Sequence, residues 1–247
     1  MRIRHENRVN FLFSTVFTVI SFSHVAFSQS NTASHNLILP PVINNVKAYK
    51  NSILSDSSKR LVSLQAFIPQ IVIDLKYAAK NNFTHTVLYT NPAAFARQAA
   101  ATALKKVTAD FNKKGLTIKI FDAYRPYEVT QKMWKLVHDE RYAANPTKGS
   151  GHNRGAAFDI TLVKISTGEE LAMPTQFDDF SERAHHNYSQ LPTEVIQNRE
   201  LLKNTMEKFG FASLSTEWWH YSLPDAASKF ELLDLSFKQL DKLEKQQ

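Results

Sequence analysis

The segment Ser150–Asp159, SGHNRGAAFD, constrains the fold of this chain more than any other stretch. Its first half is rich in glycine, serine and asparagine, which predicts a loop whose backbone can turn tightly. The run AFDITLV (157–163) then alternates apolar residues with small or polar ones, which is typical of a β-strand. Phe158 and Ile160 should therefore face the core, and Asp159 should lie on the opposite face.

His152 in this loop and Asp159 in this strand could be two ligands of a metal ion. A histidine and an aspartate seven residues apart are common by chance, and such a pair is more often a surface histidine and an unrelated carboxylate. The nearby Gly151 and Gly155 strengthen the case, because backbone can approach closely at glycine. A loop ligand followed by a strand ligand would be half of a metal site.

A second run, EWWHY (217–221), supplies the other candidate residues. Its aromatic, β-prone sequence and the following Pro224 favour a strand, with Glu217 at its start and His220 on one of its faces. The alternative is that the aromatic residues belong to the core and His220 is a hydrogen-bonded neighbour.

Together the two runs predict a zinc site with one ion per chain. The chain has no cysteine, so any zinc ligand must be histidine, aspartate or glutamate. His152, Asp159 and His220 make a three-ligand set that leaves the fourth position for water, whose pKa zinc lowers to about 7. Glu217 would take the proton of that water as general base.

Arg125, in the run DAYRP (122–126), is our candidate for the positive group that stabilises a developing oxyanion. The sequence places it between the end of a strand and the start of a helix. The alternative is an ordinary ion pair with Asp122 or a surface site, which is the usual role of an isolated arginine.

Local patterns along the chain predict an α+β domain with a small, mostly antiparallel central sheet flanked by helices. Alternating β-branched runs predict the strands, and periodic apolar positions with capping and proline signals predict the helices. The expected strands are 71–75, 116–122, 157–163, 211–214 and 218–223, and the expected helices are 91–112, 127–142 and 192–210.

Both ends of the chain should lie outside this domain, which would span residues 68–225. Residues 1–28 combine a basic start, a short apolar run and small residues before Gln29, which is typical of a signal peptide. The apolar run is short for a membrane anchor, so we expect an exported protein, periplasmic or secreted, without stable membrane insertion. Residues 29–67 would form an arm or linker, and residues 226–247 an amphipathic helix packed on the domain.

These motifs resemble those of the D-alanyl-D-alanine dipeptidases, zinc enzymes of the wider D,D-carboxypeptidase and hedgehog-like superfamily. The metal motifs, SxHxxGxAxD (150–159) and EWWHY (217–221), point to the superfamily, and the segments 74–84 and 177–186 narrow the resemblance to the dipeptidases. The resemblance spans residues 68–223. It implies a hedgehog-like, D,D-peptidase-like fold and a small peptide substrate, D-alanyl-D-alanine.

Matching positions carry the family's roles onto this chain. They imply that His152, Asp159 and His220 bind zinc, that Glu217 is the general base, and that Arg125 stabilises the transition state.

Further positions that the resemblance singles out concern the substrate. Ser150, Asp178 and Tyr89 would lie near its amino end, where an ammonium group needs a negative partner such as Asp178. The alternative for Asp178 is a solvated turn. His185 and His186 should be structural, because the zinc set is complete without them.

Two other functions compete with the dipeptidase. One is a zinc D,D-carboxypeptidase that trims D-alanine from peptidoglycan stem peptides, and the other is a non-catalytic cell-wall module with structural zinc. Structural zinc sites usually have four protein ligands, so three ligands beside a glutamate favour catalysis. The net charge of +7 lacks long basic runs, so we expect no nucleic-acid partner. An exported dipeptidase would fit cell-wall turnover.

Overall fold

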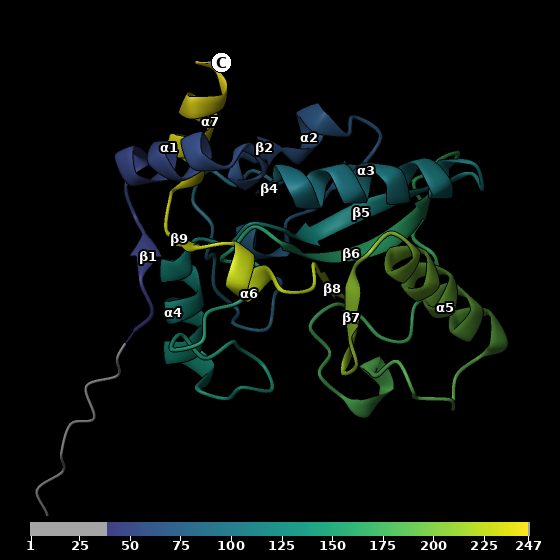
Figure 1. Ribbon diagram of the computed structural model, residues 1–247. Helices are drawn as coiled ribbons and strands as arrows, with labels where there is room; N and C mark the ends of the chain where they lie inside the picture. The colour runs from purple at the N-terminus through teal and green to yellow at the C-terminus, as the bar shows by residue number, and fades with distance from the viewer. Residues whose placement is uncertain (1–38, 247) are drawn as a thin grey trace, which may run out of the picture. The chain divides into compact units, whose positions relative to one another are not determined.

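The computed structural model describes residues 39–246, which belong to one compact unit (Figure 1). The predicted signal peptide and the first part of the predicted arm lie outside these residues. The helices are α1 (Val46–Ser55), α2 (Leu64–Phe67), α3 (Gln98–Asn112), α4 (Tyr127–Val137), α5 (Thr193–Lys208), α6 (Ala226–Lys229) and α7 (Phe237–Glu244). The strands are β1 (Val42–Ile43), β2 (Leu61–Ser63), β3 (Val72–Ile73), β4 (Phe95–Arg97), β5 (Leu116–Asp122), β6 (Ala157–Lys164), β7 (Ala212–Leu214), β8 (Glu217–Ser222) and β9 (Leu232–Leu233).

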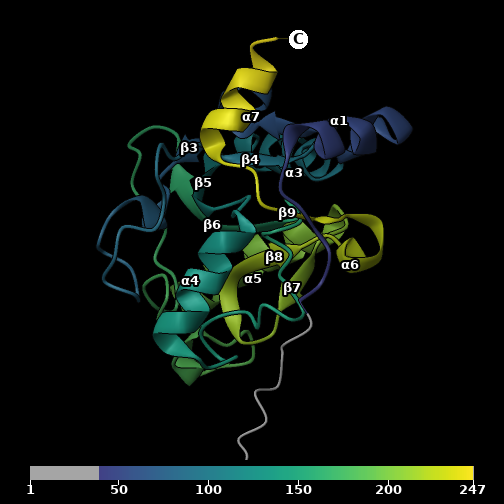
Figure 2. The ribbon, with the colours of Figure 1, turned by 90° about the vertical axis from the view of Figure 1, so that its left-hand side faces the viewer.

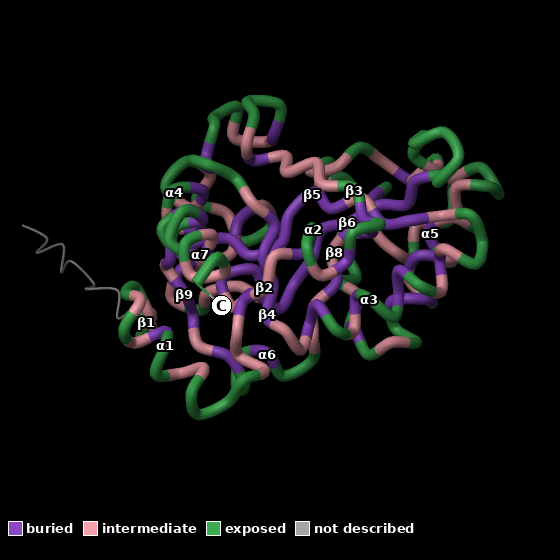
Figure 3. Tube along the Cα trace, turned by 90° about the horizontal axis from the view of Figure 1, so that it is seen from above, coloured by how far each residue is buried: buried purple, intermediate pink, exposed green. Residues whose placement is uncertain are grey.

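The largest sheet has the strand order β3-β5-β6-β8-β7. Strand β3 pairs parallel with β5, and the other three pairings are antiparallel, which confirms the predicted mostly antiparallel sheet. Strand β6 lies in the middle, and all its residues except Lys164 are buried, as the purple tube of Figure 3 shows. The α+β class predicted from the sequence is confirmed.

Helices α3 and α5 pack against this sheet and against each other. Their apolar side chains form one buried cluster with Phe158, Ile160 and Leu162 of β6. The prediction that Phe158 and Ile160 face the core is therefore confirmed, and Leu162 continues the same face. Burial of this apolar surface is the main force that fixes β6 in place.

The segment 42–67 is not an arm or linker, as we had predicted, but part of the body. Strand β2 within it pairs antiparallel with β4. The buried Tyr49 of α1 ties the segment to this pair, because its hydroxyl accepts a hydrogen bond from the backbone N–H of Leu61 at 2.6 Å. The sequence concealed these elements because they are too short to show a periodic pattern.

Two predicted helices have different bounds in the structure. Helix α3 begins at Gln98 rather than at Asn91, because Phe95–Arg97 is extended and pairs with β2. Helix α4 ends at Val137, short of the predicted residue 142, and His138 beyond it has a left-handed backbone with φ 45°.

The predicted C-terminal helix over 226–247 is divided into α6, β9 and α7. Strand β9 pairs parallel with β1, and the extended segment buries Leu232 and Leu235 along with Leu233. A single helix would point these leucines in several directions. The predicted packing of this tail on the domain is confirmed for α7, which lies beside α1 (Figure 2) and buries Phe237 and Leu240. Within residues 39–246, no helix is both long enough and apolar enough to cross a membrane.

Arg97 joins the N-terminal and C-terminal segments to the loop before β6. Its side chain is fully buried, and its guanidinium donates to the backbone oxygens of Arg154 at 2.9 Å, Glu231 at 3.1 Å and Lys59. An arginine guanidinium has five N–H donors in a fixed fork, so it can satisfy several carbonyl groups at once.

Replacing Arg97 should therefore destabilise the fold strongly. Arg97→Met would leave three carbonyl oxygens without their donor, and we expect a loss of about 3–5 kcal/mol in the free energy of unfolding. Urea denaturation followed by circular dichroism measures this loss. The matched control is Arg141→Met, which removes an arginine paired with Asp139 on the surface and should unfold close to the wild type. Equal midpoints for the two variants would contradict the role of Arg97.

Candidate metal centre

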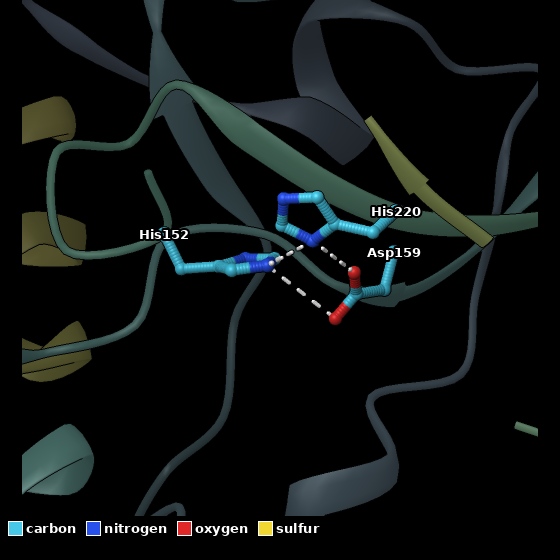
Figure 4. A group of neighbouring side chains, drawn as sticks. All are labelled: His152, Asp159 and His220. Carbon is cyan, nitrogen blue, oxygen red and sulfur yellow. Dashed lines mark hydrogen bonds and ion pairs between the residues drawn. The ribbon is translucent and has the colours of Figure 1, made fainter. Parts of the chain in front are cut away.

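Three side chains, from two segments that are far apart in sequence, meet near the start of β6. The antiparallel register of β6 and β8 sets Asp159 opposite His220. His152 comes from the loop before β6, and Figure 4 shows the three side chains pointing toward one another. The loop turns tightly at glycine, as predicted: Gly155 has φ +66°, and a Cβ on Gly151 would lie 2.9 Å from the Cβ of Ala157.

The distances within this cluster suit one metal ion. His220 Nδ1 lies 2.9 Å from Asp159 Oδ1, His152 Nε2 lies 3.4 Å from Asp159 Oδ2, and the two imidazole nitrogens are 3.2 Å apart. Ligand atoms on one tetrahedral zinc ion are about 3.3 Å apart, given zinc–ligand bonds of about 2.0 Å. The structure therefore brings together the three residues that the sequence nominated as ligands.

A backbone contact fixes which nitrogen of His152 faces the cluster. Nδ1 donates its proton to the carbonyl oxygen of Ala123 at 2.8 Å, because a carbonyl can only accept. The lone pair of a neutral imidazole is then on Nε2, which is the atom that faces Asp159 and His220. A hydrogen bond from the far nitrogen is the usual way in which proteins orient a histidine ligand.

Asp159 is ionised in this setting. Burial opposes its ionisation, but the adjacent imidazoles of His152 and His220 more than offset that cost and hold the pKa of this carboxyl well below its usual range. An ionised carboxylate beside two imidazoles is a donor set that zinc prefers.

These residues line a cavity of about 230 Å³, which is smaller than the usual pocket for a drug-sized ligand. The other cavity-lining residues on which the site depends are Tyr77, Arg125, Arg141, Tyr142, Ser150, Asp178, Phe180, Glu217 and Trp219. A larger cavity of about 430 Å³ lies beside β1 and the segment 227–232 and contains none of them. Small size and convergent polar groups make the first cavity the candidate site.

Glu217 lies at the start of β8 and lines this cavity, as predicted from the sequence. Burial raises the pKa of its carboxyl to about 7; His220 acts against this rise, and the negative charge of Asp159 adds to it. A carboxyl that titrates near neutral pH can both accept and release a proton under ordinary conditions.

Arg125 has features of both roles that the sequence left open. Its Nε and Nη2 donate to Asp122 Oδ2 at 2.9 and 2.6 Å, which is the ion pair of the alternative interpretation. Yet its Nη2 also lies 3.9 Å from Asp159 Oδ2, and the guanidinium lies 5.0 Å from the ring of Tyr77, on the cavity wall. The ion pair therefore holds a buried cation beside the cluster.

Asp178 lies on the cavity wall with its backbone in a left-handed conformation, φ 62°. Tyr77 donates to its Oδ1 at 3.1 Å, while its Oδ2 is buried and makes no hydrogen bond with the described residues. Burial, followed by the charge of Asp159, raises the pKa of this carboxyl to about 7. The alternative for Asp178, a solvated turn, does not fit the burial of its carboxylate. Ser150 also lines the cavity, as predicted.

Tyr89 does not line the cavity, contrary to the prediction. It is buried, and its hydroxyl donates to Asp122 Oδ1 at 2.5 Å. It therefore lies behind the carboxylate that holds Arg125. Tyr77 and Tyr142 are the tyrosines that line the cavity. Tyr77 was not predicted as a site residue, although it belongs to the family-like run DLKYA (74–78).

Asn153 is a second residue that the sequence analysis missed. It is fully buried, and its amide donates to the backbone oxygen of Arg125 at 2.9 Å and to Thr130 Oγ1 at 2.8 Å. Its own Oδ1 accepts from the backbone N–H of Ser150 at 3.0 Å. These bonds join the histidine loop to the start of α4, and no local pattern distinguishes such an asparagine from a turn residue.

His185 and His186 are absent from the metal cluster in the described part of the chain. The ring of His186 packs against Tyr221, with ring centroids 6.1 Å apart. This placement agrees with the prediction that His185 and His186 are not zinc ligands.

Comparison with known proteins gives one consistent family. A family model described as D-ala-D-ala dipeptidase matches residues 57–240. The D-alanyl-D-alanine dipeptidase of Escherichia coli is 38% identical over 175 residues, which cover 71% of this chain and 90% of that protein. The proteins of the same name from Enterococcus faecalis and Streptomyces coelicolor are 33% and 30% identical, over 62% and 65% of this chain and 85% and 91% of their own lengths.

The matched region also corrects the predicted domain bounds of 68–225. It begins before residue 68 and continues past residue 225, so it includes β2 and the first half of α7. Both segments pack on the body through buried residues such as Leu61 and Phe237. They therefore belong to the domain.

Removing one cluster residue should abolish tight zinc binding. We expect the purified protein to bind one zinc ion, and His220→Ala to weaken binding by at least about 100-fold because a direct ligand is lost. Isothermal titration calorimetry with zinc measures the affinity and stoichiometry. The control is His185→Ala, which removes a histidine outside the cluster and should leave both unchanged. Equal zinc affinity in the two variants would exclude His220 as a ligand.

Proposed function

Because this chain belongs to the D-alanyl-D-alanine dipeptidase family, we propose that it hydrolyses the peptide bond of free D-alanyl-D-alanine with one zinc ion. The observation that carries this proposal is the shared cavity. The His152–Asp159–His220 cluster and Glu217, whose carboxyl titrates near neutral pH, line the same small space. A metal-ligand set and a free carboxylate in one pocket are the groups that amide hydrolysis needs.

The donor set fits zinc in type and number. Two imidazole nitrogens and one carboxylate give three protein ligands, as catalytic zinc sites have, and the fourth position remains for water or substrate. When bound, zinc supplies Lewis acidity, which polarises the scissile carbonyl and lowers the pKa of a water molecule. His152, Asp159 and His220 are the residues proposed to hold it.

Glu217 is the proposed general base and then general acid. It takes one proton from the attacking water, whose oxygen forms the new bond to the carbonyl carbon. The same proton passes to the leaving amine as the C–N bond breaks, so the products are two molecules of D-alanine. Burial raises the pKa of this carboxyl, which makes its carboxylate form a better proton acceptor than an exposed one.

Arg125 is the proposed partner of the negative charge that develops on the carbonyl oxygen. Its two bonds to Asp122 and the Tyr77 ring beside it fix its orientation before substrate arrives. Such preorganisation lets a cation stabilise the transition state without reorganising during the reaction.

Asp178 is proposed to bind the substrate's ammonium group. Its buried Oδ2 lacks a partner among the described residues and can accept a charge-assisted hydrogen bond. Ser150, on the cavity wall beside the histidine loop, is proposed to contact the same part of the substrate.

The two competing functions receive less support. The curated relatives reported above are named D-alanyl-D-alanine dipeptidases, which favours a free dipeptide over a stem peptide attached to the cell wall. A structural zinc site would need neither Glu217 nor the buried Arg125 in the cavity.

We also propose that the protein acts outside the cytoplasm, in the turnover of cell-wall peptides. The support is the basic and then apolar sequence of residues 1–28, which resembles a signal peptide. Fractionation of expressing cells, followed by N-terminal sequencing, tests it. Uncleaved protein in the cytoplasmic fraction would refute export.

Loss of the Glu217 carboxylate should remove hydrolysis but not zinc. Glu217→Gln preserves the side-chain shape and should lower kcat for D-alanyl-D-alanine by about 10²–10⁴-fold, the usual contribution of general acid–base catalysis. Release of D-alanine measures the rate, and zinc content is determined in the same samples. A matched control is Glu182→Gln, an exposed residue outside the cavity, which should keep the wild-type rate.

A stem pentapeptide ending in D-Ala-D-Ala is the second substrate for this assay. We expect the wild type to release D-alanine from the free dipeptide and much less from the pentapeptide. Preferential cleavage of the pentapeptide would show a carboxypeptidase instead. Full activity of Glu217→Gln would disprove the role of Glu217.

A further inference from the structure

A free dipeptide carries two charges, and the roles proposed so far account for only one of them. Asp178 can receive the ammonium group, but the terminal carboxylate also leaves water and needs donors. Among residues 39–246, the basic residues on the cavity wall are Arg125 and Arg141, apart from the two histidines of the cluster. One of these two arginines is therefore the natural partner of the carboxylate.

Arg125 is already paired with Asp122 and is proposed to act at the reacting centre. Two of its N–H groups bond Asp122, and its Nη2 lies 3.9 Å from Asp159 Oδ2, next to the metal cluster. That position suits the carbonyl oxygen at the reacting centre. The terminal carboxylate of a dipeptide lies beyond the scissile bond and needs a donor farther from the cluster.

Arg141 lies on the loop after α4 and lines the cavity. Its side chain is 76% exposed, yet the residue contributes to the cavity wall. Its present partner is the nearby Asp139, which accepts from its Nε and Nη2 at 2.6–3.1 Å. Exposed ion pairs are weak, and the hydrogen bonds to Asp139 leave Nη1 unused, so the guanidinium can bond a second carboxylate.

A series of ring contacts joins this loop to β8 along the cavity wall. The guanidinium of Arg141 lies 5.2 Å from the ring centroid of Tyr142, which meets Phe180 edge to face at 4.9 Å. Phe180 in turn meets Trp219 of β8 at 6.1 Å. Tyr142, Phe180 and Trp219 all line the cavity, so the loop position is tied to the strand that carries His220.

We propose that Arg141 binds the terminal carboxylate of the substrate, and that this contact makes a free carboxylate next to the scissile bond a requirement for tight binding. The proposal rests on the proposed dipeptidase function, which it deepens by naming a specificity-determining residue. Ammonium at Asp178 and carboxylate at Arg141 then select a peptide of two residues by its two charged ends.

The test measures binding, so that it does not depend on catalysis. Zinc-loaded Glu217→Gln protein is titrated in a calorimeter with D-alanyl-D-alanine and with D-alanyl-D-alanine amide, which lacks only the carboxylate charge. We expect the free acid to bind at least about tenfold more tightly than the amide. Adding Arg141→Met should remove this preference by weakening the free acid and leaving the amide unchanged.

Lys148→Met is the matched control for the loss of one positive charge. Lys148 is on the same loop and is 68% exposed, but it pairs with Glu140 and does not line the cavity. This variant should keep the preference for the acid. Arg141→Lys, which keeps the charge but not the fork, should retain part of it.

The proposal would be overturned if Arg141→Met weakened the binding of the acid and of the amide equally, or weakened neither. In the protein with Glu217 intact, the same substitution should raise KM for the dipeptide and change kcat little. Suppose that the free acid binds more tightly only when Arg141 is present, but that the wild-type protein does not cleave the dipeptide. That result would support the Arg141 contact and refute the proposed hydrolysis. Failure of both ligands to bind would refute both.

Discussion

The pairing of β6 with β8 is the interaction on which the site depends. It sets Asp159 opposite His220, and a slip of one residue would send one of them to the other face of the sheet. The register has little freedom, because the alternate residues Phe158, Ile160 and Leu162 are fixed in the core between the sheet and its helices. Core packing on one side of the strand thus sets the ligand spacing on the other.

Asp122 organises the groups around that pair. It lies opposite Asp159 in the register of β5 with β6 and is fully buried, which a carboxylate tolerates only with donors around it. Tyr89, the backbone of Ala123 and Arg125 provide those donors. Asp122 does not line the cavity, yet its bonds to Arg125 determine where that cation lies on the cavity wall.

The sequence predicted the parts of this site that local patterns encode. The alternation in 157–163 placed Asp159 on the non-core face, and the motif spacing singled out His220 and Glu217. It did not predict that Tyr89 faces Asp122 rather than the cavity, because that contact joins residues 33 apart in a chain whose loop gives no periodic signal. The short strand β9 was missed for a related reason: its partner β1 is far away in sequence, and a two-residue strand has no pattern of its own.

The charges of the cavity link metal binding to substrate binding. Without a cation in the cluster, the carboxyls of Asp178 and Glu217 both have pKa values of about 7. Burial is the largest cause of each rise in pKa, and the negative charge of Asp159 adds to both. A divalent ion held by Asp159 cancels that charge and favours the ionised form of both carboxyls. Ionised Asp178 is the form that binds an ammonium group, and ionised Glu217 is the form that accepts a proton. The zinc site would therefore prepare the substrate's amino-end contact as well as the base, although neither residue is a ligand.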